Sequence, residues 1–153
     1  MPINIAPALK KNGSNQAIGR SKGGLSTKIH AVVDALGNPT AFTLTPGQAC
    51  DLDGADQLLP DIEADMLLAD KAYDAEDRVI EPLRAAGKEI VIPPKRNRRE
   101  QRSYDKEIYK ARHLIENFFC KLKQFRAIAT RYDKTARNFL AAVYLAATTV
   151  WLI

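Results

Sequence analysis

Short strand-like segments alternate with helix-like segments along the chain, and this order narrows the possible folds more than any other property of the sequence. Apolar and polar side chains alternate in residues 27–33, which is the periodicity of a strand. Residues 34–39 are rich in turn formers, and residues 40–45 are a second β-prone run. These segments predict a β-hairpin, which the pair Pro46-Gly47 ends.

The middle of the chain predicts helices separated by short strands. Asp51 is placed to cap a helix that stops near Pro60, and residues 66–70 form a short apolar run that ends in a carboxylate. Such a run is typical of a central strand. A further helix should begin at Asp74 or Asp77 and close at Gly87, and residues 89–93 predict another strand.

The last third of the chain predicts helices after a basic loop, which we define as residues 93–100. Asp105 should cap a long helix running to about Arg126, and Thr135 should start a final helix. Residues 1–24 show no sustained period and predict an irregular arm. The order of elements therefore predicts an α/β fold with a helical C-terminus.

Composition limits the class of protein without identifying it. The 153 residues are 46% hydrophobic, which suffices for a core, and Cys50 and Cys120 form no C-x-x-C pair. The start of the chain lacks the features of a secretory signal, and the apolar run over residues 139–153 is too short to span a bilayer. We therefore expect a cytoplasmic protein whose last helix is buried. The net charge of +5 is a weak indication of a polyanionic partner.

Asp70 is the first candidate site residue, because the carboxyl ends of strands in α/β sheets are where ligand-binding side chains collect. A carboxylate there is fixed by the strand and open to solvent, as a metal ligand must be. By position alone, the pattern favours an aspartate that caps a helix or forms a turn.

The predicted long helix carries a second group of candidates on one stripe. Tyr109, Arg112, Glu116 and Lys123 fall within an arc of roughly 60° in an ideal helix. Glu116 could bind a divalent cation, while the two cationic side chains could contact phosphates. On spacing alone, a solvated helix face on which Arg112 pairs with Glu116 is the favoured interpretation.

The sequence resembles the DDE transposases of insertion sequences. Tyr109-x2-Arg112-x3-Glu116-x6-Lys123 is similar to the Y-x2-R-x3-E-x6-K signature of that family, and the segments over residues 19–30, 68–74, 111–126 and 131–140 resemble the insertion-sequence-five group within the IS4-like superfamily. The similar segments occur in the family's order from about residue 15 to the end of the chain.

This resemblance implies an RNase H-like domain over residues 25–153, with a mixed sheet flanked by helices. Asp70 matches the second of the family's three acidic metal ligands and Glu116 matches the third. In the complete enzyme two Mg²⁺ ions, for which Mn²⁺ can substitute, would activate the attacking oxygen and stabilise the leaving oxygen during DNA cleavage and strand transfer. The DNA partners would be the ends of the insertion sequence and its target.

The same resemblance assigns DNA-facing or supporting roles to several other residues. Arg112 and Lys123 match the family's basic positions, and Tyr109 would support them. The basic loop would add phosphate contacts. The alternative for this loop is a solvated segment without a ligand. Its candidate residues are Lys95, Arg96, Arg98 and Arg99, with Arg102 beyond them.

The chain departs from the family where the first catalytic aspartate is expected. Residues 1–9 contain no acidic residue, and the first acidic residue is Asp34, a routine turn former in the predicted hairpin. The chain is then either the downstream product of a split reading frame or a truncated copy, and the first strand of the sheet would be missing. That predicts a homodimer, or pairing with an upstream transposase segment. The alternative function is an inactive DNA-binding remnant that acts as a competitor or subunit.

Overall fold

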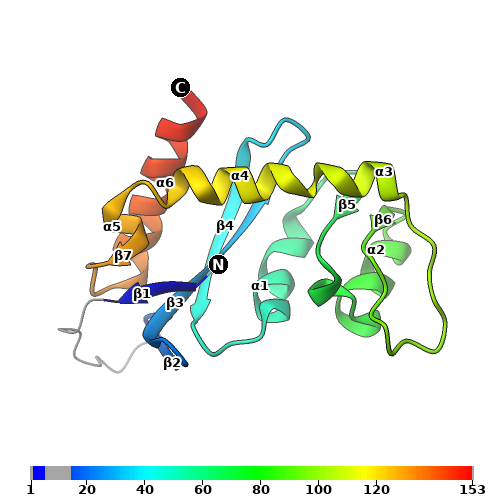
Figure 1. Ribbon diagram of the computed structural model, residues 1–153, viewed down its shortest axis with the longest axis horizontal. Helices are drawn as coiled ribbons and strands as arrows, with labels where there is room; N and C mark the ends of the chain where they lie inside the picture. Colours follow the sequence, from blue (N-terminus) through cyan, green and yellow to red (C-terminus); the bar gives the residue numbers. More distant parts are fainter. Residues whose placement is uncertain (1, 6–14, 153) are drawn as a thin grey trace. The chain divides into compact units, whose positions relative to one another are not determined.

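The computed structural model describes residues 2–5 and 15–152 and has a mixed α/β architecture (Figure 1). Its residues form two compact units. The first unit combines residues 1–50 with residues 114–153, and the second consists of residues 51–113. The prediction of an α/β fold with a helical C-terminus is confirmed, and each unit has a sheet and a core of its own.

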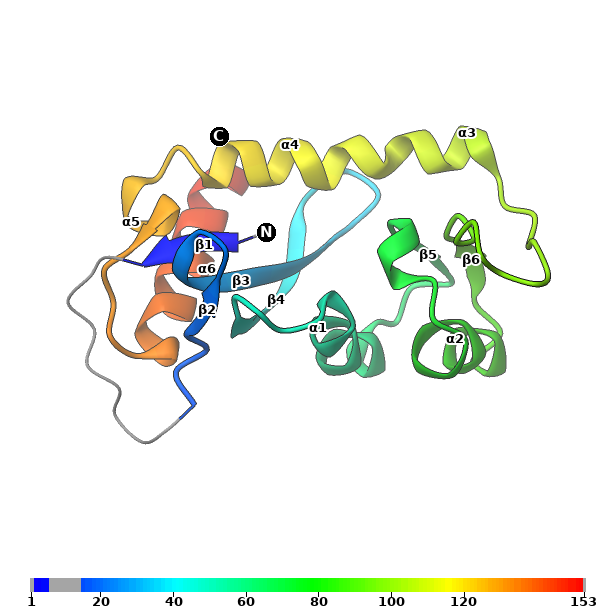
Figure 2. The same ribbon diagram turned by 60° about the horizontal axis from the view of Figure 1, so that its bottom comes forward.

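The first unit is built around a mixed sheet. β3 (Gly24–Val33) pairs in antiparallel fashion with β4 (Pro39–Pro46), β2 (Gly19–Ser21) and β1 (Pro2–Ile5). β1 also pairs in parallel with β7 (Thr130–Arg131), so that β1 lies between β3 and β7 (Figure 1; β1 and β3 are seen from another side in Figure 2). The predicted hairpin is therefore confirmed as β3 and β4, in which Ile29 lies opposite Leu44 and Ala31 opposite Phe42.

A turn over residues 34–38 joins the two hairpin strands. Gly37 has φ +87°, a left-handed conformation that glycine adopts without steric cost. The Asp34 side chain accepts hydrogen bonds from the Leu36 amide at 2.8 Å and the Asn38 amide at 2.9 Å. These contacts explain why the turn-forming residues occur at these positions.

Two helices supply most of the core of the first unit. The buried residues Phe118 and Leu122 belong to α4 (His113–Leu122), and Phe139 and Val143 belong to α6 (Ala136–Leu152). Together with Ile29 and Phe42 of the hairpin and Ile128 of α5 (Arg126–Ala129), they form one apolar cluster. The predicted burial of the last helix is correct for one face only, because Leu145 and Trp151 are exposed.

The second unit contains a βαβ arrangement. β5 (Met66–Leu68) and β6 (Glu89–Val91) are parallel, and the chain between them forms a 3-10 turn (Lys71–Tyr73), a π-helical turn (Glu76–Ile80) and α2 (Glu81–Ala85). α1 (Asp51–Leu58) and a 3-10 turn (Leu59–Asp61) precede β5. The buried side chains of Ala55, Val79, Ile80, Leu83 and Ile92 form the core of this unit.

The predicted long helix begins where the sequence indicated. The Asp105 carboxylate accepts hydrogen bonds from the amides of Glu107 and Ile108 at 2.8 Å and 3.0 Å. α3 (Lys106–Tyr109) follows, then a 3-10 turn (Lys110–Arg112), then α4. The α-helix ends at Leu122, ahead of the predicted end at Arg126.

The N-terminal part of the chain differs from the prediction. Residues 1–24 were expected to be irregular, yet β1 and β2 lie within them, because both form backbone hydrogen bonds with β3. A strand ahead of the hairpin is thus present in the sheet, and the expectation that it would be missing is wrong. Its residues, Pro2-Ile-Asn-Ile5, include no acid.

One further difference concerns the number of sheets. The sequence predicted one mixed sheet, whereas β5 and β6 form a separate two-stranded sheet.

Both edges of β1 are paired, with β3 on one side and β7 on the other. Among the described residues, no helix is long and apolar enough to cross a membrane.

Candidate functional site

Asp70 lies two residues after β5, in the second unit. Its Oδ1 atom accepts a hydrogen bond from the Ala72 amide at 3.2 Å and caps the 3-10 turn that begins at Lys71. The capping role left open by the sequence is therefore present. The side chain is 44% exposed, so solvent reaches the carboxylate.

Arg112 contacts Asp70, although 42 residues separate them in the chain. The Arg112 guanidinium lies 3.4 Å from the other Asp70 oxygen, Oδ2. The centre of the same guanidinium lies 5.8 Å from the centroid of the Tyr109 ring, and that ring meets Tyr104 edge to face at 5.5 Å. The second unit thus brings together three of the predicted site residues: Asp70, Tyr109 and Arg112.

Glu116 and Lys123 belong to the first unit. Glu116 lies in α4 and Lys123 directly follows it, and both side chains are exposed. The 3-10 turn at Lys110–Arg112 interrupts the α-helical geometry between Tyr109 and Glu116. The single uniform stripe expected for an ideal helix is therefore not formed over its whole length.

Asp34 behaves as a turn residue. Besides the two backbone amides of its turn, its Oδ2 atom accepts a hydrogen bond from the Asn38 side chain at 3.1 Å. The hydrogen bond from the Asn38 amide contributes most to lowering the pKa of Asp34 below its ordinary value. Both carboxylate oxygens thus have partners inside the hairpin turn.

The basic loop is attached to the rest of its unit through Asp74. The Asp74 side chain is completely buried and accepts hydrogen bonds from the Lys95 amide and from Arg98 Nε, both at 2.6 Å. Arg102 donates to the second Asp74 oxygen at 3.2 Å. Arg98 also forms an ion pair with Glu76 at 2.6 Å.

These contacts change the ionisation of the groups involved. Burial alone would raise the pKa of Asp74, but hydrogen bonds from Arg98, Lys95 and Arg102 together lower it below its ordinary value. The hydrogen bond from Arg98 is likewise the main cause that lowers the pKa of Glu76. Asp74 and Glu76 are therefore ionised at neutral pH, and the hydrogen bonds to these two carboxylates raise the pKa of Arg98 above its ordinary value.

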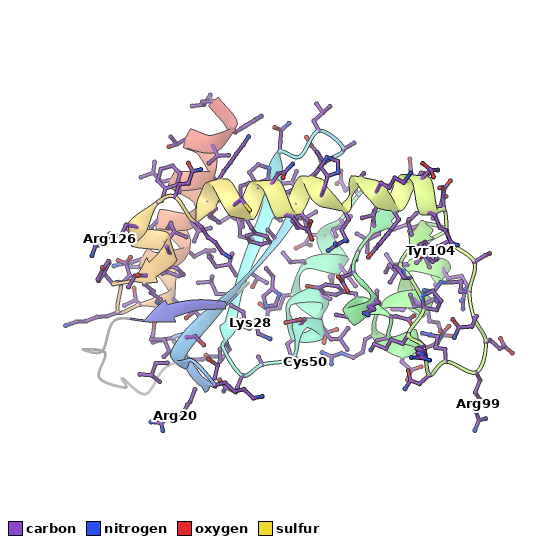
Figure 3. All side chains as sticks on the ribbon, in the orientation of Figure 1. Arg20, Lys28, Cys50, Arg99, Tyr104 and Arg126 are labelled. Carbon is purple, nitrogen blue, oxygen red and sulfur yellow. The ribbon has the colours of Figure 1, made fainter. Side chains whose placement is uncertain are left out.

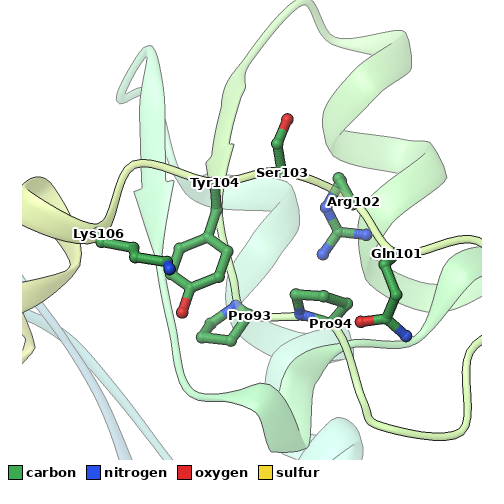
Figure 4. A pocket seen from close by; sticks show the side chains of 7 residues that line it. All are labelled: Pro93, Pro94, Gln101, Arg102, Ser103, Tyr104 and Lys106. Atoms are coloured by element: carbon green, nitrogen blue, oxygen red, sulfur yellow. The ribbon is translucent and has the colours of Figure 1, made fainter.

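Other cationic side chains of the basic loop extend into solvent. Arg96 and Arg99 are exposed, and Arg99 points away from its unit (Figure 3). Next to the loop lies a shallow pocket of about 430 Å³, walled by two prolines, the Tyr104 ring and polar side chains (Figure 4). Its lining residues are Pro93, Pro94, Gln101, Arg102, Ser103, Tyr104 and Lys106.

The described residues do not form a complete metal centre. Among residues 2–5 and 15–152 there is no group of three or more histidine, cysteine, aspartate or glutamate side chains that could hold a metal ion. Asp70 has a partly exposed carboxylate just after a strand, and Glu116 offers an exposed carboxylate in the other unit. The structure thus supplies single carboxylates where the resemblance implies a set of three.

The role of Asp74 in holding the basic loop was not predicted from the sequence. This residue lies in the Leu68–Asp74 segment that resembles the family, where the pattern indicated Asp70 as a candidate ligand and Asp74 only as a possible start of a helix. Its partners lie 21 to 28 residues further along the chain. The available signal for this contact was an acidic residue between two apolar segments, followed later in the chain by an arginine-rich loop.

Comparison with known proteins identifies the family. The chain matches the family model described as "Transposase DDE domain" over residues 3–151. It is 39% identical over 132 residues to a protein of Brucella ovis named "Putative transposase for insertion sequence element IS6501", a match that covers 84% of this chain and 99% of that protein. No solved structure matches the chain. The chain belongs to the DDE transposase family, as its sequence motifs predicted.

Proposed function

We propose that this chain catalyses metal-dependent DNA strand cleavage and strand transfer in the transposition of an insertion sequence, on an RNase H-like domain. Its membership of the DDE transposase family supports DNA as the substrate. The observation that carries the proposal is the contact between Asp70 and Arg112. Two residues from separate family motifs, far apart in sequence, meet in one unit at the end of a strand.

In this proposal Asp70 and Glu116 are the second and third acidic ligands for Mg²⁺ ions. Asp70 uses one oxygen to cap the following turn, and its other oxygen has a long contact to a partly exposed arginine. An exposed ion pair of this kind contributes about 0–1 kcal/mol, so a cation can replace Arg112 at little cost. Carboxylate oxygens are the ligands that Mg²⁺ prefers.

The cationic residues would hold the DNA backbone. Arg112, when displaced from Asp70, and Lys123 of the first unit are proposed phosphate contacts, and Tyr109 supports the Arg112 guanidinium. Lys95, Arg96 and Arg99 of the basic loop extend the proposed DNA-contacting surface, and Arg98 supports the loop through Asp74 and Glu76. Such contacts give affinity without reading the base sequence.

A plasmid-nicking assay tests the catalytic proposal. The full chain with Mn²⁺ should convert supercoiled plasmid to the nicked form, and both Asp70→Asn and Glu116→Gln should abolish this conversion. The matched controls are Asp77→Asn and Glu107→Gln, which remove an exposed carboxylate from the same unit as Asp70 and from the helical segment before Glu116. Nicking that survives either site substitution would overturn the assignment.

One set of observations favours the second candidate, an inactive DNA-binding subunit. No acidic residue precedes Asp34, and both Asp34 oxygens have partners in the turn. In this candidate function the first ligand comes from an upstream transposase segment or another copy of the chain. DNA binding without nicking favours the subunit, and nicking that appears only when an upstream transposase segment is added assigns the first ligand to that segment.

A further inference from the structure

The arginines in and beside the basic loop have two different environments. Arg96 and Arg99 are exposed, whereas Arg98 and Arg102 turn inward and are 22% and 19% exposed. The inward pair meets at Asp74, whose side chain has no exposure to solvent. The basic loop is thus not a uniformly solvated cluster of positive charge.

Asp74 is bonded to the loop at its start and in its middle. Its Oδ2 atom accepts hydrogen bonds from the Lys95 amide and from the Arg98 side chain. Arg102, just beyond the loop, donates to Asp74 Oδ1 and to the Ile92 carbonyl, which just precedes the loop. One buried carboxylate therefore contacts the start of the loop, its middle and a residue just beyond its end.

Two further contacts fix the same segment. The Gln101 side chain donates to the carbonyls of Lys95 and Arg98, both at 3.2 Å. Glu76 accepts from Arg98 on one oxygen and from Arg84 on the other. With Arg98 fixed on both sides in this way, the backbone directions at residues 96 and 99 are also defined.

We propose that Asp74 is a positioning residue for DNA binding, which holds the basic loop so that Arg96 and Arg99 face the phosphates of the DNA backbone. This inference rests on the proposed function, in which the loop contacts DNA. Arg98 and Arg102 anchor the loop in this account. The exposed pair, Arg96 and Arg99, then makes the phosphate contacts.

Asp74→Asn should change the affinity for DNA in the direction opposite to that expected from its change in net charge. Asp74→Asn removes one negative charge, and a general electrostatic effect would make the variant bind DNA more tightly. Loss of loop order would make it bind more weakly, because mobile arginines pay more conformational entropy at each contact. Asp77→Asn makes the same change of charge at an exposed position three residues away and serves as the matched control.

The experiment measures binding of the full chain to a fluorescein-labelled, random-sequence DNA duplex by anisotropy over a series of KCl concentrations. We expect the double variant Arg96→Ala/Arg99→Ala to lower the slope of log affinity against log salt by about two, since each lost phosphate contact removes about 0.9. Asp74→Asn should lower affinity roughly tenfold and lower the slope in the same direction. Asp77→Asn should bind as tightly as the natural chain or slightly more tightly.

A double-mutant cycle separates positioning from general loss of structure. Adding Asp74→Asn to Arg96→Ala/Arg99→Ala should produce little further loss of affinity, because the side chains that Asp74 positions are already absent. Arg98→Lys provides a second test, which replaces the first if Asp74→Asn fails to fold. A lysine at this position keeps the positive charge but cannot reach Asp74 and Glu76 together, so this variant should also bind DNA more weakly.

The outcomes distinguish the inference from the function on which it rests. If Arg96→Ala/Arg99→Ala leaves binding unchanged, the basic loop does not contact DNA, and the proposed role of the loop fails with the inference. If that double variant weakens binding while Asp74→Asn and Arg98→Lys match Asp77→Asn, only the inference is overturned. The inference would also be overturned if Asp74→Asn lowered the affinity for DNA equally in the natural chain and in the Arg96→Ala/Arg99→Ala variant.

Discussion

Three aspartates of this chain show how surroundings decide what a carboxylate does. Asp34 is exposed and bonded within its own turn, Asp74 is buried between arginines, and Asp70 is half exposed with one long contact. Of the three, Asp70 combines access to solvent with the weakest attachment to its partners. That combination is what a metal ligand needs.

The buried position of Asp74 makes its charge important for stability. Asp74→Asn should lower the free energy of unfolding by about 2–3 kcal/mol, because the hydrogen bonds from Arg98 and Arg102 lose their charged acceptor. Urea unfolding followed by circular dichroism measures the loss. An unchanged midpoint would show that the buried pair does not stabilise the fold.

This contribution should also depend on pH in a defined direction. The pKa of Asp74 is lowered in the folded chain, so its stabilising effect is complete above the unfolded pKa of about 3.9 and is lost as the pH falls through the lower, folded value. The difference in stability between the natural chain and Asp74→Asn should therefore be constant from pH 5 to 7 and shrink below about pH 4. A difference that disappears nearer neutral pH would contradict the lowered pKa.

Residue-level features were predictable from sequence only where their partners are local. The Asp105 cap and the Asp34 turn form hydrogen bonds within four residues, and both were predicted. The Asp74 contacts join residues more than 20 positions apart, so no local pattern could indicate them. The same local sequence fits Asp70 as a cap and as a candidate ligand, and the structure shows the cap.

At the scale of elements, the hairpin gives a direct test of turn geometry. Gly37→Ala should destabilise the chain by about 1–2 kcal/mol, because φ at this position is +87°. A β-carbon there would make only ordinary contact with Leu114, at 3.5 Å, so steric overlap is not the cause. Thermal unfolding measures the change.

The control is Gly37→Asn, since asparagine tolerates the left-handed conformation better than alanine does. The loss should therefore be smaller for asparagine. Equal losses for the two variants would rule out backbone conformation as the cause.

Elements with a strong internal pattern were found from the sequence, and those that depend on distant pairing were not. The alternation in β3, the β-prone composition of β4, the cap at Asp51 for α1, the apolar stripe of α4 and the apolar run of α6 were sufficient. β1 and β2 have little pattern of their own and exist through hydrogen bonds to β3. The π-helical turn at Glu76–Ile80 and the 3-10 turn at Lys110–Arg112 also gave no sequence signal.

At the scale of the whole molecule, the sequence predicted the class of fold and the family but not the arrangement of strands. β5 and β6 were expected in the same sheet as the hairpin, whereas they form their own sheet in the second unit. Which strand edges pair depends on tertiary packing, which periodicity does not encode. The two acidic candidates, Asp70 and Glu116, belong to different units for the same reason.

The proposed function requires both Asp70 and Glu116 as ligands of divalent cations in the full chain. Titration calorimetry with Mn²⁺ tests it most directly, using the natural chain, Asp70→Asn and Glu116→Gln, with Asp77→Asn and Glu107→Gln as controls. We predict binding by the natural chain and both controls, and no binding by either site variant. Absence of binding by the natural chain at millimolar Mn²⁺, or binding that survives either site substitution, would contradict the claim.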